Sequence, residues 1–246
     1  MKLGIIGGFG PLATAAFYEK IVNMTDASSD QEHIETLIYS KPQIPERVDY
    51  ILGKSAVNPA PEIRQIAFDL EEQNVDIIAL PCVTVHYFYD EITSGLCVPL
   101  LNMLDETVDF LHHNHFTRVG ILGTAGTVLG GHLAAALKAG NIEYILPDKS
   151  NQDKISSVIF DNVKSGTVSG TDEIQKIGDS LFQQGAEVIL LACTELSVLN
   201  MKYPFTGSYI DMMDLLAEDA IQKCGKKVRT EMTAHAKLKQ TLPATY

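Results

Sequence analysis

The chain has 246 residues, of which 46% are hydrophobic and 20% are charged, a composition that supports a packed core and excludes a largely disordered protein. This length fits one large α/β domain or two small ones. The 31 acidic residues outnumber the 19 Lys and Arg, and the net charge of -12 argues against partners that need a basic face, such as nucleic acids and anionic membrane surfaces.

Short apolar runs that end in Gly, Pro or Cys predict buried parallel strands. In chain order these runs span residues 3–6, 37–39, 77–80, 100–101, 119–122 and 188–192. Helical spacing is found between them, at 13–25, 61–73, 103–112, 131–139, 153–164, 172–184 and 212–224. The alternation predicts a doubly wound α/β fold with a parallel sheet. The basic tail, 226–246, is expected to be a surface helix or a frayed end without a catalytic role.

An internal repeat divides the chain. The glycine pattern 4-7-10 recurs at 120-123-126 in the same register, and residues 70–82 match 181–193. A third match pairs 101–105 with 210–214. Because the period of roughly 110 residues is too long for a solenoid, the repeat indicates a duplicated domain. We therefore expect two pseudo-symmetric doubly wound domains with the active site in the cleft between them.

The matches also suggest the domain bounds. The first domain is expected to contain residues 1–99 and about 208–225, and the second to contain 100–207. The apolar start, 1–8, is too short for a signal peptide and is interpreted as a buried strand. No apolar run reaches the 18 residues of a membrane span. The four cysteines lack CxxC spacing, so we expect a reducing compartment, the cytoplasm, and no structural zinc.

Two glycine-rich loops follow equivalent strands. The first is Gly7-Gly8-Phe9-Gly10-Pro11-Leu12-Ala13-Thr14, and the second is Gly123-Thr124-Ala125-Gly126-Thr127. Backbone N–H groups in such loops can bind an anion at a helix N-terminus, which makes Gly10 a candidate binding residue. A simple tight turn explains either loop equally well. The GGxG spacing differs from the GxGxxG of dinucleotide-binding folds, so no such cofactor is expected.

Cys82 and Cys193 are the most informative pair. Each ends a predicted strand and begins a helix, a position that lowers the pKa of a thiol. A pseudo-twofold axis would place the two thiols on opposite sides of one cleft. Racemisation needs such a pair, because one group removes a Cα proton and the other returns a proton on the opposite face. A metal site with His86 or a covalent nucleophile is the alternative, although His86 more simply orients its loop.

These residues resemble the aspartate/glutamate racemase family, the cofactor-independent amino-acid racemases. The resemblance covers about residues 2–224. It rests on the two glycine-rich loops, on Pro42-Gln43-Ile44-Pro45-Glu46-Arg47, on Pro81-Cys82-Val83-Thr84 and on Ala192-Cys193-Thr194-Glu195. It implies two α/β domains, catalytic Cys82 and Cys193, no cofactor, no metal and a homodimer.

The resemblance also implies a basic pair for the substrate carboxylates. Arg47 and Lys164 match those positions, and an arginine fork in a proline-bounded loop suits a carboxylate. A solvated surface arginine and a simple helix cap at Lys164 are the alternatives. The hydroxyls of Thr84, Thr127 and Thr194, with nearby N–H groups, would hold the α-carboxylate and stabilise the carbanion-like transition state.

The chain departs from the family pattern at one important position. Val83 stands where the family usually has Asn, and Phe9 stands where Met is common. Glu195 occupies the place of a His in the glutamate-specific branch, so the chain is closer to the aspartate branch. The sequence therefore predicts a pyridoxal-independent racemase of an acidic amino acid, aspartate first and glutamate second. A related isomerase or decarboxylase and a non-catalytic amino-acid-binding protein are the alternatives.

Overall fold

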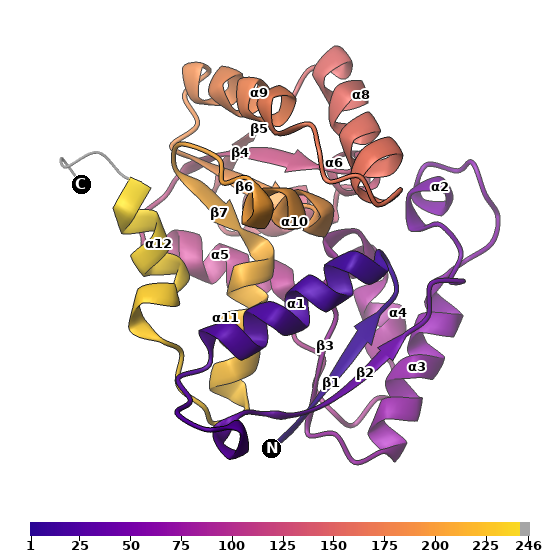
Figure 1. The fold of residues 1–246 in the computed structure, drawn as a ribbon. Helices are drawn as coiled ribbons and strands as arrows, with labels where there is room; N and C mark the ends of the chain where they lie inside the picture. Colours follow the sequence, from indigo (N-terminus) through magenta and orange to yellow (C-terminus); the bar gives the residue numbers. More distant parts are fainter. Residues whose placement is uncertain (242–246) are drawn as a thin grey trace.

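Two parallel sheets form the framework of the computed structural model, which describes residues 1–241. The first sheet has the order β2-β1-β3, with β1 (Lys2–Gly7), β2 (Glu35–Ser40) and β3 (Ile77–Ala79). The second has the order β5-β4-β6-β7, with β4 (Arg118–Gly123), β5 (Glu143–Ile145), β6 (Val188–Ala192) and β7 (Tyr209–Asp211). Figure 1 shows one sheet above the other, with helices between and around them.

The two sheets follow one plan, which confirms the predicted fold class. β1 and β4 are each flanked by the next strand on one side and by the strand before a cysteine on the other. Leu100 makes a single parallel bridge to Ile78. In the first sheet this bridge is the counterpart of the pairing between β7 and β6 in the second. The predicted strand at 100–101 is thus only a bridge. The short strands β5 and β7 were not predicted, because each contains a charged residue and lacks the continuous apolar run that identified β3.

Helices connect the strands as expected from the alternation. Their bounds are α1 (Pro11–Met24), α2 (Arg47–Ile51), α3 (Ala60–Glu72), α4 (Tyr89–Thr93), α5 (Met103–His113), α6 (Ala125–Leu129), α7 (His132–Ala139), α8 (Lys149–Ser157), α9 (Thr171–Gln183), α10 (Thr194–Lys202), α11 (Met212–Lys223) and α12 (Ala234–Thr241). The 3-10 helices are η1 (Asp30–Glu32), η2 (Val83–Phe88) and η4 (Thr230–Met232). The helix predicted at 153–164 is divided, because α8 continues as a π-helix, η3 (Val158–Val163).

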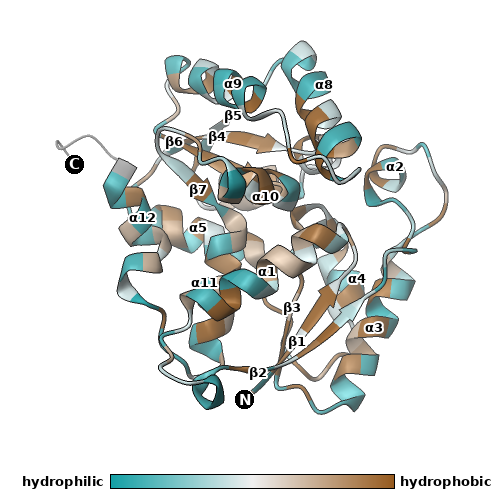
Figure 2. Ribbon diagram, viewed as in Figure 1, coloured by the Kyte–Doolittle hydropathy of each residue, from teal (hydrophilic) through white to brown (hydrophobic). Residues whose placement is uncertain are grey.

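Apolar strands and one-sided helices account for this layering. Leu3, Ile5 and Ile6 of β1 are fully buried, and the central strands β1 and β4 are brown in Figure 2. The outer helix α9 buries Ile174 and Leu181 and leaves its polar residues to solvent, which is the amphipathic pattern of a surface helix. Each fully buried Leu or Ile contributes about 1.5–3 kcal/mol to stability.

Helices α5 and α11 connect the two halves. α5 follows the Leu100 bridge of the first sheet and packs against α7 and α11, whereas α11 follows β7 and packs against α1 and β3. Within the segment 208–225, predicted to join the first domain, β7 pairs in the second sheet, and α11 packs against elements of the first half. The division of the chain into domains remains a prediction.

The tail is a helix in the part that the structure describes. Leu238 of α12 is only 2% exposed, and Lys237 forms an ion pair with Asp214 at 2.8 Å. The tail therefore packs on the core more closely than its weak apolar pattern indicated, and its last residues, 242–246, lie outside the described residues. Within residues 1–241, no helix is both long and apolar enough to span a membrane.

Candidate active site

Cys82 and Cys193 occupy equivalent places in the two halves. Cys82 follows β3 and stands at the N-cap of η2, and Cys193 follows β6 and stands at the N-cap of α10. The two residues are 7% and 5% exposed, and both line one cavity. The structure thus brings together the two thiols that the repeat paired, although the helix after Cys82 is a 3-10 helix.

The cavity between the thiols is small. Its volume is about 10 Å³, which is close to the minimum that holds one water molecule. Residues of both halves line it, namely Phe9, Glu46, Arg47, Val48, Val83, Thr84, Thr124, Lys164, Thr194 and Glu195. An amino acid therefore enters only if the walls of the cleft move apart.

Arg47 is a buried residue of the cavity wall and not a solvated surface arginine. It begins α2 and is 6% exposed. Its guanidinium lies 5.1 Å from the centroid of the Phe9 ring, and its Nη1 donates to the carbonyl of Pro45 at 3.4 Å. Its Nε has no hydrogen-bond partner among the described residues. Because a buried N–H without an acceptor is costly, this donor is suited to an anionic ligand.

Lys164 reaches the cavity from the second half. It follows η3, and its Nζ lies 3.8 Å from Glu46 Oε2 and 4.0 Å from Glu195 Oε1. Glu46 also lies 3.6 Å from Arg47 Nη1. One carboxylate from the first half is thus held between the two cations that the sequence selected. Glu46 itself was not selected, because a charged residue in a loop gives no signal of its own.

Three threonine hydroxyls form a cluster between the halves. Thr84 Oγ1 lies 3.0 Å from Thr124 Oγ1 and 2.9 Å from Thr127 Oγ1, and the latter two are 3.1 Å apart. Thr84, Thr124 and Thr194 line the cavity, whereas Thr127 does not. Thr127 is therefore placed behind Thr84, and Thr124, which the sequence analysis did not select, takes its place in the wall.

Glu195 is the main residue that sequence reasoning missed. It is 4% exposed, its Oε2 accepts a hydrogen bond from Cys193 Sγ at 3.0 Å, and its Oε1 has no hydrogen-bond partner in the described chain. A side chain at Gly10, where φ is +126°, would collide with that oxygen. The absence of a side chain at Gly10 thus leaves room for the Glu195 carboxylate in the site. The signal for Glu195 was its place beside Thr194, which indicated a subfamily and no chemistry.

The electrostatic environments of the two thiols differ. Burial raises the pKa of Cys82, the guanidinium of Arg47 lowers it, and Glu195 raises it again. Burial also raises the pKa of Cys193 well above its ordinary value, and the adjacent Glu195 carboxylate raises it further. The expectation that a helix N-terminus lowers both values is wrong here, because loss of solvation outweighs the backbone N–H groups.

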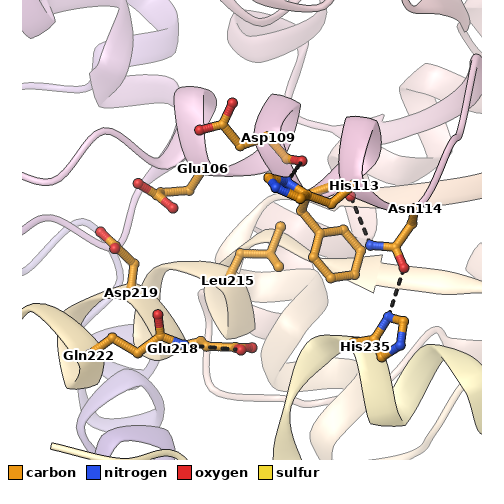
Figure 3. A pocket seen from close by; sticks show the side chains of 10 residues that line it. Glu106, Asp109, His113, Asn114, Leu215, Glu218, Asp219, Gln222 and His235 are labelled. Atoms are coloured by element: carbon orange, nitrogen blue, oxygen red, sulfur yellow. Dashed lines mark hydrogen bonds between the residues drawn. The ribbon is translucent and has the colours of Figure 1, made fainter.

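A much larger hollow lies elsewhere, between α5, α11 and α12. Its volume is about 390 Å³. Figure 3 shows Glu106 of α5 and Asp219 of α11 pointing toward each other in it, with further carboxylates nearby. Burial raises the pKa of both carboxyl groups. No thiol lines this hollow, so the cavity of the two cysteines remains the candidate site.

The fold and the cavity define an α/β protein with two buried thiols at duplicated positions. Its sequence matches the family described as Asp/Glu/Hydantoin racemase over residues 6–220. The chain therefore belongs to this family, which confirms the predicted family and the isomerase class. It is 30% identical to the broad specificity amino-acid racemase RacX of Bacillus subtilis (strain 168) over 201 residues, which cover 80% of this chain and 86% of RacX.

Solved structures show the same architecture. The aspartate racemase of Picrophilus torridus is 32% identical, with a TM-score of 0.84, over 96% of this chain and 99% of that chain. The glutamate racemase of Francisella tularensis, in complex with D-glutamate, is 15% identical, with a TM-score of 0.62, over 100% of this chain and 84% of that chain. At that identity the second likeness concerns the fold alone.

Proposed function

We propose that the chain racemises an acidic amino acid, aspartate first and glutamate second, with Cys82 and Cys193 as its two acid/base groups. One observation carries the proposal. The two buried thiols line the same small cavity as Arg47 and Lys164, so proton transfer and carboxylate binding can take place at one substrate. The similarity to the Picrophilus torridus aspartate racemase supports the choice of aspartate.

The reaction needs one thiolate and one thiol. The thiolate removes the Cα proton, and the opposite thiol gives its proton to the other face of the same carbon, so that no cofactor is required. Burial raises the pKa of both thiols, but Arg47 opposes this at Cys82, whereas Cys193 donates to the Glu195 carboxylate, which raises its pKa further. Of the two groups we therefore assign the reacting thiolate to Cys82 and the thiol to Cys193. After one turnover the two cysteines have exchanged protonation states, and a turnover in the reverse direction restores the starting state.

The proposed binding mode replaces contacts that the cavity residues make with one another, and it gives the unpartnered Nε of Arg47 an acceptor. Arg47 and Lys164 hold the side-chain carboxylate, displacing the Glu46 carboxylate that lies between them. The α-carboxylate is bound by the hydroxyls of Thr84 and Thr194, and by that of Thr124 in place of Thr127. A charge-assisted hydrogen bond of this kind is worth about 1.5–3 kcal/mol.

Part of the cavity wall is apolar and does not select for a further polar group on the substrate. Val83, Phe9 and Val48 offer no hydrogen bond to a second polar group on the substrate. The similarity to a broad specificity racemase fits a pocket of this kind. We therefore propose aspartate as the first substrate and include apolar amino acids among those to be tested.

The proposal includes a homodimer that works in the cytoplasm on a small-molecule substrate. Its test is an NMR survey of D- and L-amino acids in D₂O, in which exchange of the Cα proton reports the chemistry directly. Exchange and inversion with aspartate or glutamate support the proposal. Release of CO₂ would favour a related decarboxylase. Thermal stabilisation by an amino acid without any Cα exchange would favour a non-catalytic binding protein.

A further inference from the structure

The residue four positions after each cysteine links the cysteine's segment to the start of a later helix, α5 in the first half and α11 in the second. In the first half this residue is His86, which is 5% exposed. Its Nδ1 lies 3.0 Å from the carbonyl oxygen of Cys82, and its Nε2 accepts the backbone N–H of Met103 at 3.1 Å. Met103 is the first residue of α5.

In the second half the equivalent residue is Ser197. Its hydroxyl donates to Asp211 Oδ1 at 2.6 Å and lies 3.5 Å from the carbonyl oxygen of Cys193. Asp211 is the N-cap of α11 and accepts the backbone N–H of Met213 at 2.9 Å. Lys20 of α1 holds its other oxygen at 3.1 Å. Both halves thus connect the cysteine's segment to the start of a helix, through an imidazole in the first half and through a hydroxyl and a carboxylate in the second.

The hydrogen bonds define the form of His86. Because the Met103 N–H is a donor, Nε2 must be the acceptor, and Nδ1 therefore carries the proton that it donates to Cys82. A neutral ring is consistent with burial, which lowers the pKa of His86. His86 does not line the cavity, and both of its ring nitrogens are engaged in hydrogen bonds. Its ring proton is therefore not available for exchange with a substrate.

The helices held in this way cross between the halves. α5 begins beside the Cys82 segment and packs against α7 and α11, and α11 begins beside the Cys193 segment and packs against α1. We propose that His86 and Ser197 are positioning residues, each of which fixes one thiol relative to the opposite half of the molecule. This inference rests on the proposed function, in which both thiols must reach one Cα atom.

If each residue serves one thiol, its loss affects one face of the substrate. Racemisation cannot reveal this, because its equilibrium constant is one and kcat/KM must be equal in both directions. Elimination of HCl from β-chloroaspartate can. One thiolate removes the Cα proton, the electron pair forms a C=C bond and chloride leaves; the resulting enamine tautomerises and water hydrolyses it to a keto acid and ammonia. Each Cα enantiomer therefore reacts with a single thiol, and the release of chloride measures the rate of that reaction.

The experiment compares four variants of the full chain on the two Cα enantiomers of β-chloroaspartate. Cys82→Ser and Cys193→Ser first assign each enantiomer to its thiol. His86→Leu is expected to lower elimination from the Cys82 enantiomer by about 10²-fold, the typical cost of a displacement near 1 Å, and to change the other less than about threefold. Ser197→Ala is expected to show the opposite preference.

His86→Gln provides a second test, in which the hydrogen-bonding groups of the side chain are returned to residue 86. Its amide retains one donor and one acceptor, so it should restore most of the lost elimination. Equal losses for both enantiomers in His86→Leu or Ser197→Ala would overturn the inference, as would a Gln variant no better than Leu. If Cys82→Ser and Cys193→Ser fail to separate the enantiomers, the two-thiol function itself is wrong, and the positioning role is lost with it.

Discussion

Replacing Glu195 by Gln removes a negative charge beside Cys193 with little change in shape. The carboxylate accepts the thiol proton at 3.0 Å, so a thiolate at Cys193 would face an adjacent like charge. Two unit charges about 4 Å apart repel by about 4 kcal/mol at an effective dielectric constant of about 20. That energy corresponds to about a 10³-fold larger thiolate population. Because a more stable thiolate is a weaker nucleophile, with a Brønsted slope near 0.5, the alkylation rate should rise by about 30-fold.

The assay is the rate of alkylation of Cys193 by iodoacetamide at neutral pH, followed by mass spectrometry of the modified peptide. The exposed Cys97 is the internal reference in every sample. Glu231→Gln is the matched control, because it changes the net charge equally at an exposed position. If Cys193 in Glu195→Gln reacts no faster than in the natural protein, relative to Cys97, the carboxylate does not hold the proton on Cys193 and our assignment of the resting thiol is wrong.

Three further predictions concern substrate binding and pH. Arg47→Ala should lower kcat/KM for aspartate about 10- to 150-fold more than for an apolar substrate, which loses only the effect of the guanidinium on the Cys82 thiolate; an equal loss on both would show that Arg47 does not bind the side-chain carboxylate. Val83→Asn should reorder kcat/KM across an amino-acid panel, because it adds an amide to the cavity wall; an identical profile would place residue 83 out of contact with the substrate. Because the pKa values of Glu106 and Asp219 are raised, these two groups bind more protons in the folded than in the unfolded state in the pH range just above the ordinary carboxyl pKa, so their contribution to stability should fall as pH rises through that range. Asp219→Asn should flatten that fall in urea denaturation between about pH 4.5 and 8, and parallel curves for the two proteins would contradict this.

The duplication made much of the fold predictable. Glycines at equivalent positions and long apolar runs before Cys82 and Cys193 located the central strands, because parallel strands buried on both faces are continuously apolar. The edge strand β5 was missed, since its residues Glu143–Ile145 are partly exposed and lack that pattern. The π-helical turn before Lys164 was also invisible, as one extra residue in a helix leaves no clear periodic signal.

The candidate site was predictable where the repeat or the family pattern selected a residue. The pairing of the thiols and the place of Arg47 and Lys164 followed from position in the sequence. What the sequence could not indicate was burial. It is burial, together with Glu195, that reverses the expected direction of the Cys193 pKa, and a carboxylate near a thiol in space cannot be distinguished from a solvated one by spacing alone.

The two-thiol mechanism itself makes the most direct prediction about the origin of the new Cα hydrogen. When aspartate is racemised in D₂O, one thiolate removes the proton from one face of Cα. The opposite thiol has exchanged its hydrogen with the solvent and delivers a deuteron to the other face. NMR of the earliest product should therefore find deuterium at Cα, while the remaining substrate still carries its original proton. Product that retains the substrate's own Cα proton would contradict the account, because a single group would then have carried it from one face to the other.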